Sequence, residues 1–173
     1  IYGREGVVFP SPGINANDSF FSKMDVNNEE RSRLYIGLMG QGLRSTVAVS
    51  WVIAAILQGV EELDLGNELT DEELDSYWTL VADHNSKREL GRSANATRDE
   101  IPSRVKVYAS TEDSERGPGY NVLELKAHSD TPIPVARQKL QQKHTRQAPS
   151  VDIVPCTNII SVVVDIDRLG LML

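Results

Sequence analysis

The sequence has few of the residues that covalent or metal scaffolds require. Cys156 is the one cysteine among 173 residues, so no disulfide can form within the chain, and only a free thiol or an intermolecular link remains. The histidines, His84, His128 and His144, are isolated, and no His/Cys pair has the spacing of metal ligands. We therefore expect no metal and no other cofactor. A chain of this length can bury a sufficient core without either.

Positive charge is also scarce. Eighteen basic residues stand against 25 acidic ones, which gives a net charge of −7 and a pI near 5.0. Because nucleic-acid affinity depends on neutralising phosphates, this balance argues against a nucleic-acid partner. The first thirty residues hold no basic stretch followed by an apolar one, and the sequence begins at Ile1, as a processed or trimmed product would.

One long hydrophobic run stands out against this polar background. Residues 45–60 carry no charge and lie between Arg44 and Glu61. As a helix they would reach about 24 Å at 1.5 Å per residue, short of the hydrocarbon layer of about 30 Å. We therefore expect a core helix that is enclosed on every side rather than a membrane span. Its principal side chains are Val49, Trp51, Val52, Ile53, Ile56 and Leu57.

Local patterns predict the other elements. Acids in a first turn predict a helix over 29–39, and Thr70 with Glu73 forms a capping-box pattern at the start of a helix over 71–83. The remaining expected elements are a strand near 6–9, a hairpin of 104–108 with 120–126, a helix over 135–146, a strand at 151–154 and a central strand at 159–166. Together these elements predict an α+β fold of one domain, residues 1–173. In it an antiparallel sheet packs against helices in two layers, and the hydrophobic helix is fully buried.

Few clusters in the sequence suggest chemistry. His128, Ser129 and Asp130 are triad residue types, but neighbours on an extended segment point to opposite faces, so a turn after a strand is the better interpretation. The glycines of residues 37–42 lack the Gly-Lys-Ser/Thr ending of a phosphate loop and favour a helix stop. A small hydrolase using His128 with a distant carboxylate remains an alternative function.

Two kinds of modification site are present. Lys87 and Arg88 form a dibasic pair within residues 84–102, a polar stretch that we expect to be an exposed loop, where proteolysis concentrates. Cleavage there would give two chains. Asn17 and Asn95 both begin the N-glycosylation pattern. These features would suit a secreted protein.

Residues 49–61 resemble the hydrophobic central helix of the salt-dependent, acidic killer toxins secreted by yeasts, whose apolar run likewise ends in Ile-Leu-Gln-Gly before an apolar residue and Glu. The resemblance implies an α/β sandwich made from a precursor that is cut at dibasic sites. With Cys156 alone, the family's disulfide pattern cannot be present.

The same resemblance implies a secreted, non-enzymatic toxin or effector. It would act on a target-cell membrane or surface protein through the helix of residues 49–57. A soluble binding or assembly domain, with that helix as ordinary core, is the alternative. The chain could also form a homo- or heterodimer, because the basic segment 137–146 could dock on the acidic segment 61–75 within one molecule or between two.

Overall fold

In the computed structural model of the protein, the described residues are 34–117, 120–126, 131–145, 148, 150–157 and 166–173. The chain divides into two compact units, Ile1–Met39 and Gly40–Leu173. Of the first unit, residues 34–39 are described; they are exposed and form no helix or strand. The helix expected over 29–39 is therefore wrong for those residues, and 29–33 lie outside the described part. Whether the whole chain is one domain stays a prediction.

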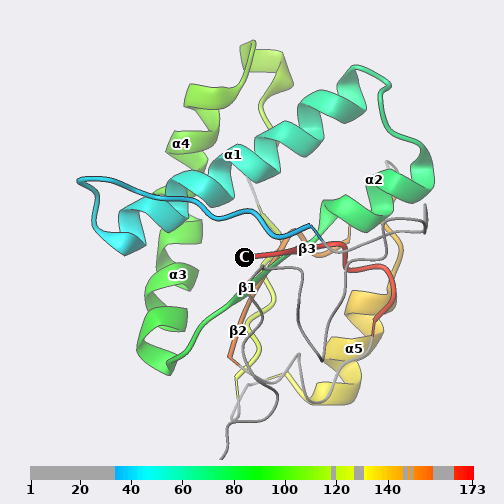
Figure 1. The fold of residues 1–173 in the computed structure, drawn as a ribbon. Coiled ribbons are helices and arrows are strands. Elements are labelled where there is room, and N and C mark those ends of the chain that lie inside the picture. Colours follow the sequence, from blue (N-terminus) through cyan, green and yellow to red (C-terminus); the bar gives the residue numbers. More distant parts are fainter. Residues whose placement is uncertain (1–33, 118–119, 127–130, 146–147, 149, 158–165) are drawn as a thin grey trace, which may run out of the picture. The chain divides into compact units, whose positions relative to one another are not determined.

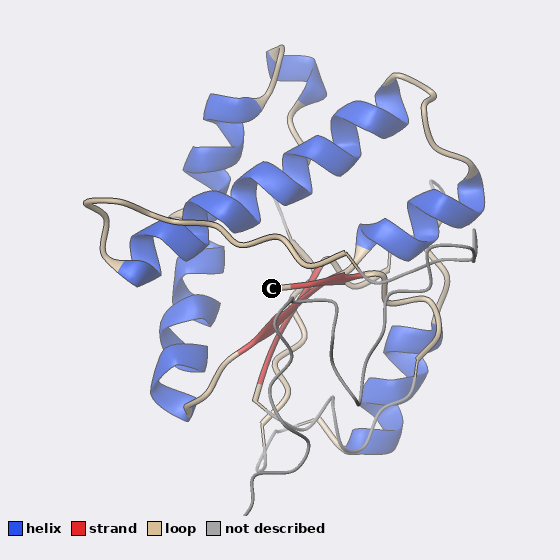
Figure 2. Cartoon of the chain, viewed as in Figure 1, coloured by secondary structure: helices blue, strands red, loops and turns tan. Residues whose placement is uncertain are grey.

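The second unit mixes helices with short strands (Figures 1 and 2). In chain order its elements are α1 (Ser45–Leu65), α2 (Asp71–Trp78), β1 (Leu80–Asp83), α3 (Lys87–Asp99), α4 (Ile101–Tyr108), the 3-10 turn η1 (Glu112–Ser114), α5 (Ile133–Gln141), β2 (Ile153–Cys156) and β3 (Leu171–Met172).

The sheet of the described residues is parallel, with the order β2-β1-β3, so the predicted antiparallel sheet is wrong. Leu80 of β1 lies between Ile153 of β2 and Leu171 of β3. Parallel strands must be joined by crossovers, and helices α3 to α5 fill the connection from β1 to β2. The first three residues of β1 and all four of β2 are buried, as expected for strands covered on both faces.

Alternate side chains of the strands enter two different hydrophobic clusters, so helices cover both faces of the sheet. Leu80 and Ile153 pack with residues of α1 and α4, whereas Val81 and Val154 pack with residues of α5. The two-layer sandwich is thus replaced by a sheet between two helical layers. This follows from the pleat, which sends successive side chains to opposite sides.

The hydrophobic run does form a helix, as predicted, but the helix is not fully buried. Its buried residues fall on one stripe that includes Ser50, Ile53, Leu57 and Asp64. The opposite side carries half-buried residues such as Val52 and, near the helix end, the exposed Leu63. Among the described helices α1 alone is long and apolar enough to cross a membrane, yet core helices pass the same test, and 33% of its apolar window is buried.

Three other expectations also fail. Residues 84–102 are mostly helix α3 rather than a loop, and residues 104–108 belong to helix α4 rather than to a strand. Residues 122 and 125 pair with β2, but in parallel and not as half of a hairpin.

The capping box of Thr70 and Glu73 is confirmed, although its helix ends at Trp78 and a strand follows. The predicted strands at 6–9 and over most of 159–166 lie outside the described residues.

Candidate functional site

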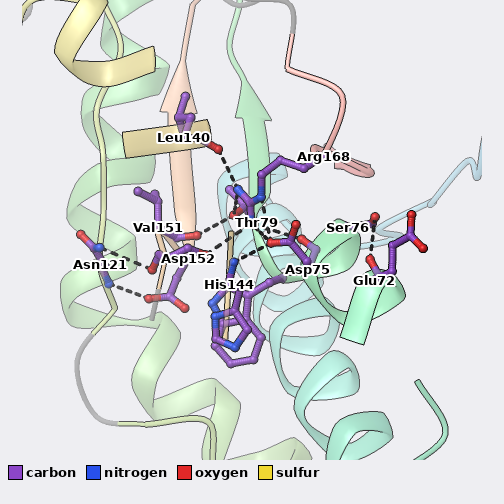
Figure 3. A network of polar contacts seen from close by, with 12 residues as sticks. Glu72, Asp75, Ser76, Thr79, Asn121, Leu140, His144, Val151, Asp152 and Arg168 are labelled. Atoms are coloured by element: carbon purple, nitrogen blue, oxygen red, sulfur yellow. Dashed lines mark hydrogen bonds and ion pairs between the residues drawn. The ribbon is translucent and has the colours of Figure 1, made fainter. Parts of the chain in front are cut away.

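A buried ion pair joins Arg168 to Asp75 near the start of β1 (Figure 3). Nε of the guanidinium donates to Oδ1 of Asp75 at 2.9 Å, and Nη2 lies 2.8 Å from the same oxygen and donates to the Asp75 backbone carbonyl at 3.2 Å. Oδ1 also accepts the backbone N–H of His144 at 2.6 Å. The side chains of Arg168 and Asp75 are 8% and 9% exposed, so both charges have been taken out of water and depend on each other.

The remaining donors of Arg168 bind three other segments. Nη1 donates to the Thr79 hydroxyl at 3.2 Å and to the Leu140 carbonyl, in the last turn of α5, at 3.0 Å. Nη2 also reaches the hydroxyl of Ser150, just before β2, at 3.4 Å. A cation suits the C-terminal end of a helix because the last carbonyls there have no partners of their own. Arg168 therefore links α2, α5 and the entry points of two strands.

Arg116 and Asp152 form a second buried pair. Nη2 of Arg116 donates to Oδ1 of Asp152 at 2.8 Å, and Nη1 donates to the carbonyl of Leu57 in α1 at 3.2 Å. The other carboxylate oxygen of Asp152 accepts the backbone N–H of Asn121 at 2.7 Å. Arg116 is 3% exposed. Its backbone N–H donates to the side chain of Gln58, so the segment that follows η1 is held against α1.

The indole of Trp78 lies between the His144 imidazole and the Arg116 guanidinium. The imidazole of His144 stacks on it at 3.5 Å between ring centroids, and the guanidinium carbon of Arg116 lies 3.8 Å from the ring centroid. Two groups this close to one ring must occupy opposite faces. Trp78 Nε1 and His144 Nδ1 are buried and have no hydrogen-bond partner among the described residues. Such orphaned atoms are uncommon in a purely structural cluster.

A pocket of about 560 Å³ opens beside the Trp78–His144 stack. Its wall includes the carboxylates of Glu61 and Asp64 from the last turns of α1. Burial raises the pKa of Glu61, and burial together with nearby Arg116 lowers the pKa of His144 from 6.5 to about 4. At neutral pH the imidazole is thus uncharged, and the pocket is suited to a ligand that donates hydrogen bonds or carries positive charge.

The described residues include no group of three His, Cys, Asp or Glu that could hold a metal ion. Cys156 is buried, and burial raises the pKa of its thiol to about 12, which makes it a poor nucleophile. What the arrangement does most clearly is fix segments that lie far apart in the sequence: the two arginines hold α1, α2, α5 and the start of β2 in one geometry.

Of the described residues predicted from the sequence, Leu57 meets this network through its carbonyl, which accepts a hydrogen bond from Arg116. Ile53 and Leu57 are buried core, while Val49, Val52 and Ile56 are half-buried. Trp51 packs edge-on against Tyr108. Lys87 and Arg88 are exposed in the first turn of α3, and Asn95 is exposed later in the same helix. Asn17 and His128 lie outside the described residues. Cleavage and glycosylation stay predictions.

Sequence analysis missed both arginine–aspartate pairs. Arg116 lies in the connection of the expected hairpin, and Asp75 is one acid among many in the acidic segment 61–75. Asp75 and Arg168 are 93 residues apart, so no local pattern joins them. The one usable signal is Asp152, an acid within the apolar run from Val151 to Val154, because a charge flanked by buried positions needs a partner.

One comparison with known proteins found a bacterial relative. The chain is similar to the DISARM protein DrmA of Bacillus paralicheniformis. The two are 33% identical over 180 residues, which cover 99% of this chain but 15% of DrmA. No protein-family model matches the chain.

This similarity corrects the functional prediction. The interpretation as a killer toxin or fungal effector is wrong, because the similarity that covers nearly the whole chain is with a bacterial DISARM protein. The secreted localisation, which followed from the toxin resemblance, is wrong for the same reason. A target-cell membrane as partner is unsupported, and so are the binding-domain and His128 hydrolase alternatives.

Proposed function

We propose that this chain acts in bacterial phage defence, as a segment of a longer DISARM-type protein that works with other proteins. The observation that carries the proposal is the 33% identity to DrmA across 99% of the chain. Because the chain spans 15% of DrmA, the activity of the whole relative does not pass to this segment. The proposal concerns the process and the class of partner.

The geometry supports a segment that holds a fixed shape. The two buried arginine–aspartate pairs join α1, α2, α5 and β2 through charge-assisted hydrogen bonds, which are the strong ones in proteins. A rigid segment of this kind can present a constant surface to protein partners.

Phage plaquing tests the proposal. Bacteria carrying the complete defence locus would be compared with bacteria in which the protein containing this segment has Arg168→Met, and with a matched strain carrying Arg98→Met. Arg98 makes an exposed ion pair with Glu124, so its loss should leave the fold intact. We expect phage to plaque more efficiently on the Arg168→Met strain alone. Equal plaquing with and without the gene for this protein would refute the role in defence.

A further inference from the structure

The pocket beside the Trp78–His144 stack has no lysine or arginine among its described lining residues. Its wall includes Glu61 and Asp64 near the end of α1, Asn67 in the turn that follows, and the two stacked rings. Its volume of about 560 Å³ falls within the usual range of ligand sites, about 300–1,000 Å³. The pocket therefore combines two carboxylates with an aromatic stack and has room for a small ligand.

Glu61 lies in this wall without a partner of opposite charge. It is half-buried, and its carboxylate forms no ion pair with the described residues. Burial raises the pKa of Glu61; of the nearby charges Arg116 lowers it, whereas Asp64, Asp152 and Glu62 raise it further. Arg116 is itself paired with Asp152 at 2.8 Å. A cation in the pocket would therefore supply the charge that the surroundings of Glu61 lack.

The stack beside these carboxylates has hydrogen-bonding groups that the described residues do not use. His144 is 7% exposed, and its Nδ1, like Nε1 of Trp78, is buried without a hydrogen-bond partner among those residues. Removing polar atoms from water without a replacement partner costs free energy. Two such atoms in residues that line one pocket indicate a ligand that supplies polar partners there.

The stack also restricts the class of cation. Quaternary ammonium groups bind over open faces of aromatic rings. Both faces of Trp78 are covered, one by His144 at 3.5 Å and the other by the guanidinium of Arg116 at 3.8 Å. A cation must then be held by hydrogen bonds to oxygen atoms. Glu61 and Asp64 lie three residues apart on α1, so they are neighbours on the helix surface, and a planar guanidinium with five N–H donors can reach both.

We propose that this pocket binds a guanidinium group, which donates hydrogen bonds to the carboxylates of Glu61 and Asp64. Hydrogen bonds between a guanidinium and a carboxylate are charge-assisted and often bidentate, so they select this cation by shape as well as by charge. The group can reach the pocket as an arginine side chain of a protein or as part of a small molecule such as free arginine. The inference does not depend on the proposed role in phage defence.

An NMR titration tests the proposal, with the indole N–H signal of Trp78 as the reporter. Trp78→Phe assigns this signal, because Trp51 is the one other tryptophan in the chain. N-acetyl-arginine amide presents a guanidinium with no other charge, and N-acetyl-citrulline amide is a neutral ligand of nearly the same shape. Choline tests the quaternary ammonium class. Each ligand is titrated from about 10 µM to about 10 mM, which covers weak binding.

Two variants examine the carboxylate. Glu61→Gln removes it, and Glu89→Gln makes the same change at an exposed position of α3 that is not part of the pocket wall. We expect the wild type and Glu89→Gln to bind the blocked arginine equally, and Glu61→Gln to bind it at least about fivefold more weakly, since a charge-assisted contact is lost. The citrulline and choline ligands should bind the wild type at least about tenfold more weakly than the blocked arginine.

Equal binding of the blocked arginine and its citrulline analogue, or of choline, would overturn the proposal. So would a Trp78 signal that no ligand shifts, or a Glu61→Gln protein that binds as Glu89→Gln does. The ligand comparisons use the wild type alone, so they decide the matter if Glu61→Gln does not fold. Free arginine then identifies the source: weaker binding than the blocked form supports a protein side chain, because Glu61 and Asp64 repel the free carboxylate, and tighter binding supports a small molecule.

Discussion

Replacing Arg168 by Met should destabilise this protein far more than the loss of an ordinary surface charge. The variant keeps an unbranched side chain of similar length but removes all the donors of the guanidinium. The carboxylate of Asp75, which is 9% exposed, would then keep one hydrogen-bond donor among the described residues, the backbone N–H of His144. Breaking one partner of a buried pair in this way costs about 3–5 kcal/mol, a large share of the roughly 5–15 kcal/mol that stabilises a typical domain.

Two further variants identify the cause. Arg98→Met removes an ion pair whose arginine is 64% exposed, and it should cost less than about 1 kcal/mol. The double variant Arg168→Met with Asp75→Leu removes both buried charges together. It should be more stable than Arg168→Met alone, because no uncompensated carboxylate remains in the interior.

Urea denaturation followed by circular dichroism measures these differences, with unchanged slopes showing that the native state is still compact. The reasoning fails if Arg168→Met unfolds at the same urea concentration as Arg98→Met. It also fails if the double variant is less stable than Arg168→Met by the full additive cost of losing Asp75, since the two side chains would then not act as a pair.

Three other predictions concern single residues. Burial and Arg116 lower the folded-state pKa of His144 to about 4, so the free energy of unfolding should be highest above pH 6.5 and fall as the pH drops from 6.5 toward 4. Urea titrations at each pH measure this dependence, and His144→Asn should make it flatter. An unchanged pH dependence in the variant would show that His144 is not its source. Ile53→Ala should lower the free energy of unfolding in urea by about 2–5 kcal/mol, and Val52→Ala, at a half-buried position, should lower it clearly less. Equal losses would contradict the one-sided burial of α1. Gly170→Ala should lower the melting temperature and cost about 1–3 kcal/mol of stability, because a Cβ at this position would lie 2.8 Å from the Ser76 carbonyl oxygen. An unchanged melting temperature would mean that the segment before β3 can move away.

Local structure could be predicted where the residues that determine it lie within one short segment. The Thr70–Glu73 capping box marks the start of α2 because both partners lie within four residues. The uncharged run gives α1, and the helix expected over 135–146 overlaps α5, which ends at Gln141. In each case the signal and the structure it specifies belong to the same helix.

Burial and strand direction could not be predicted in this way. Leu80 to Ala82 follow α2 after a single residue and continue its apolar pattern, so they read as the end of a helix, although they form the central strand. The apolar content of α1 suggested a helix covered on all sides. Its neighbours cover one side, and the buried polar residues Ser50 and Gln58 lie within the covered stripe.

The two buried arginine–aspartate pairs show why their charged residues could not be recognised as a cluster from the sequence. Asp75, Arg116, Asp152 and Arg168 come from four segments, and all but Asp152 look like surface charges in their own neighbourhoods. Buried charges of this kind must be compensated by their partners, so they cost more than apolar residues unless the segments meet in one arrangement. A wrong packing of α2 against α5 would leave Arg168 or Asp75 unpaired. The pairs therefore disfavour alternative packings of these helices.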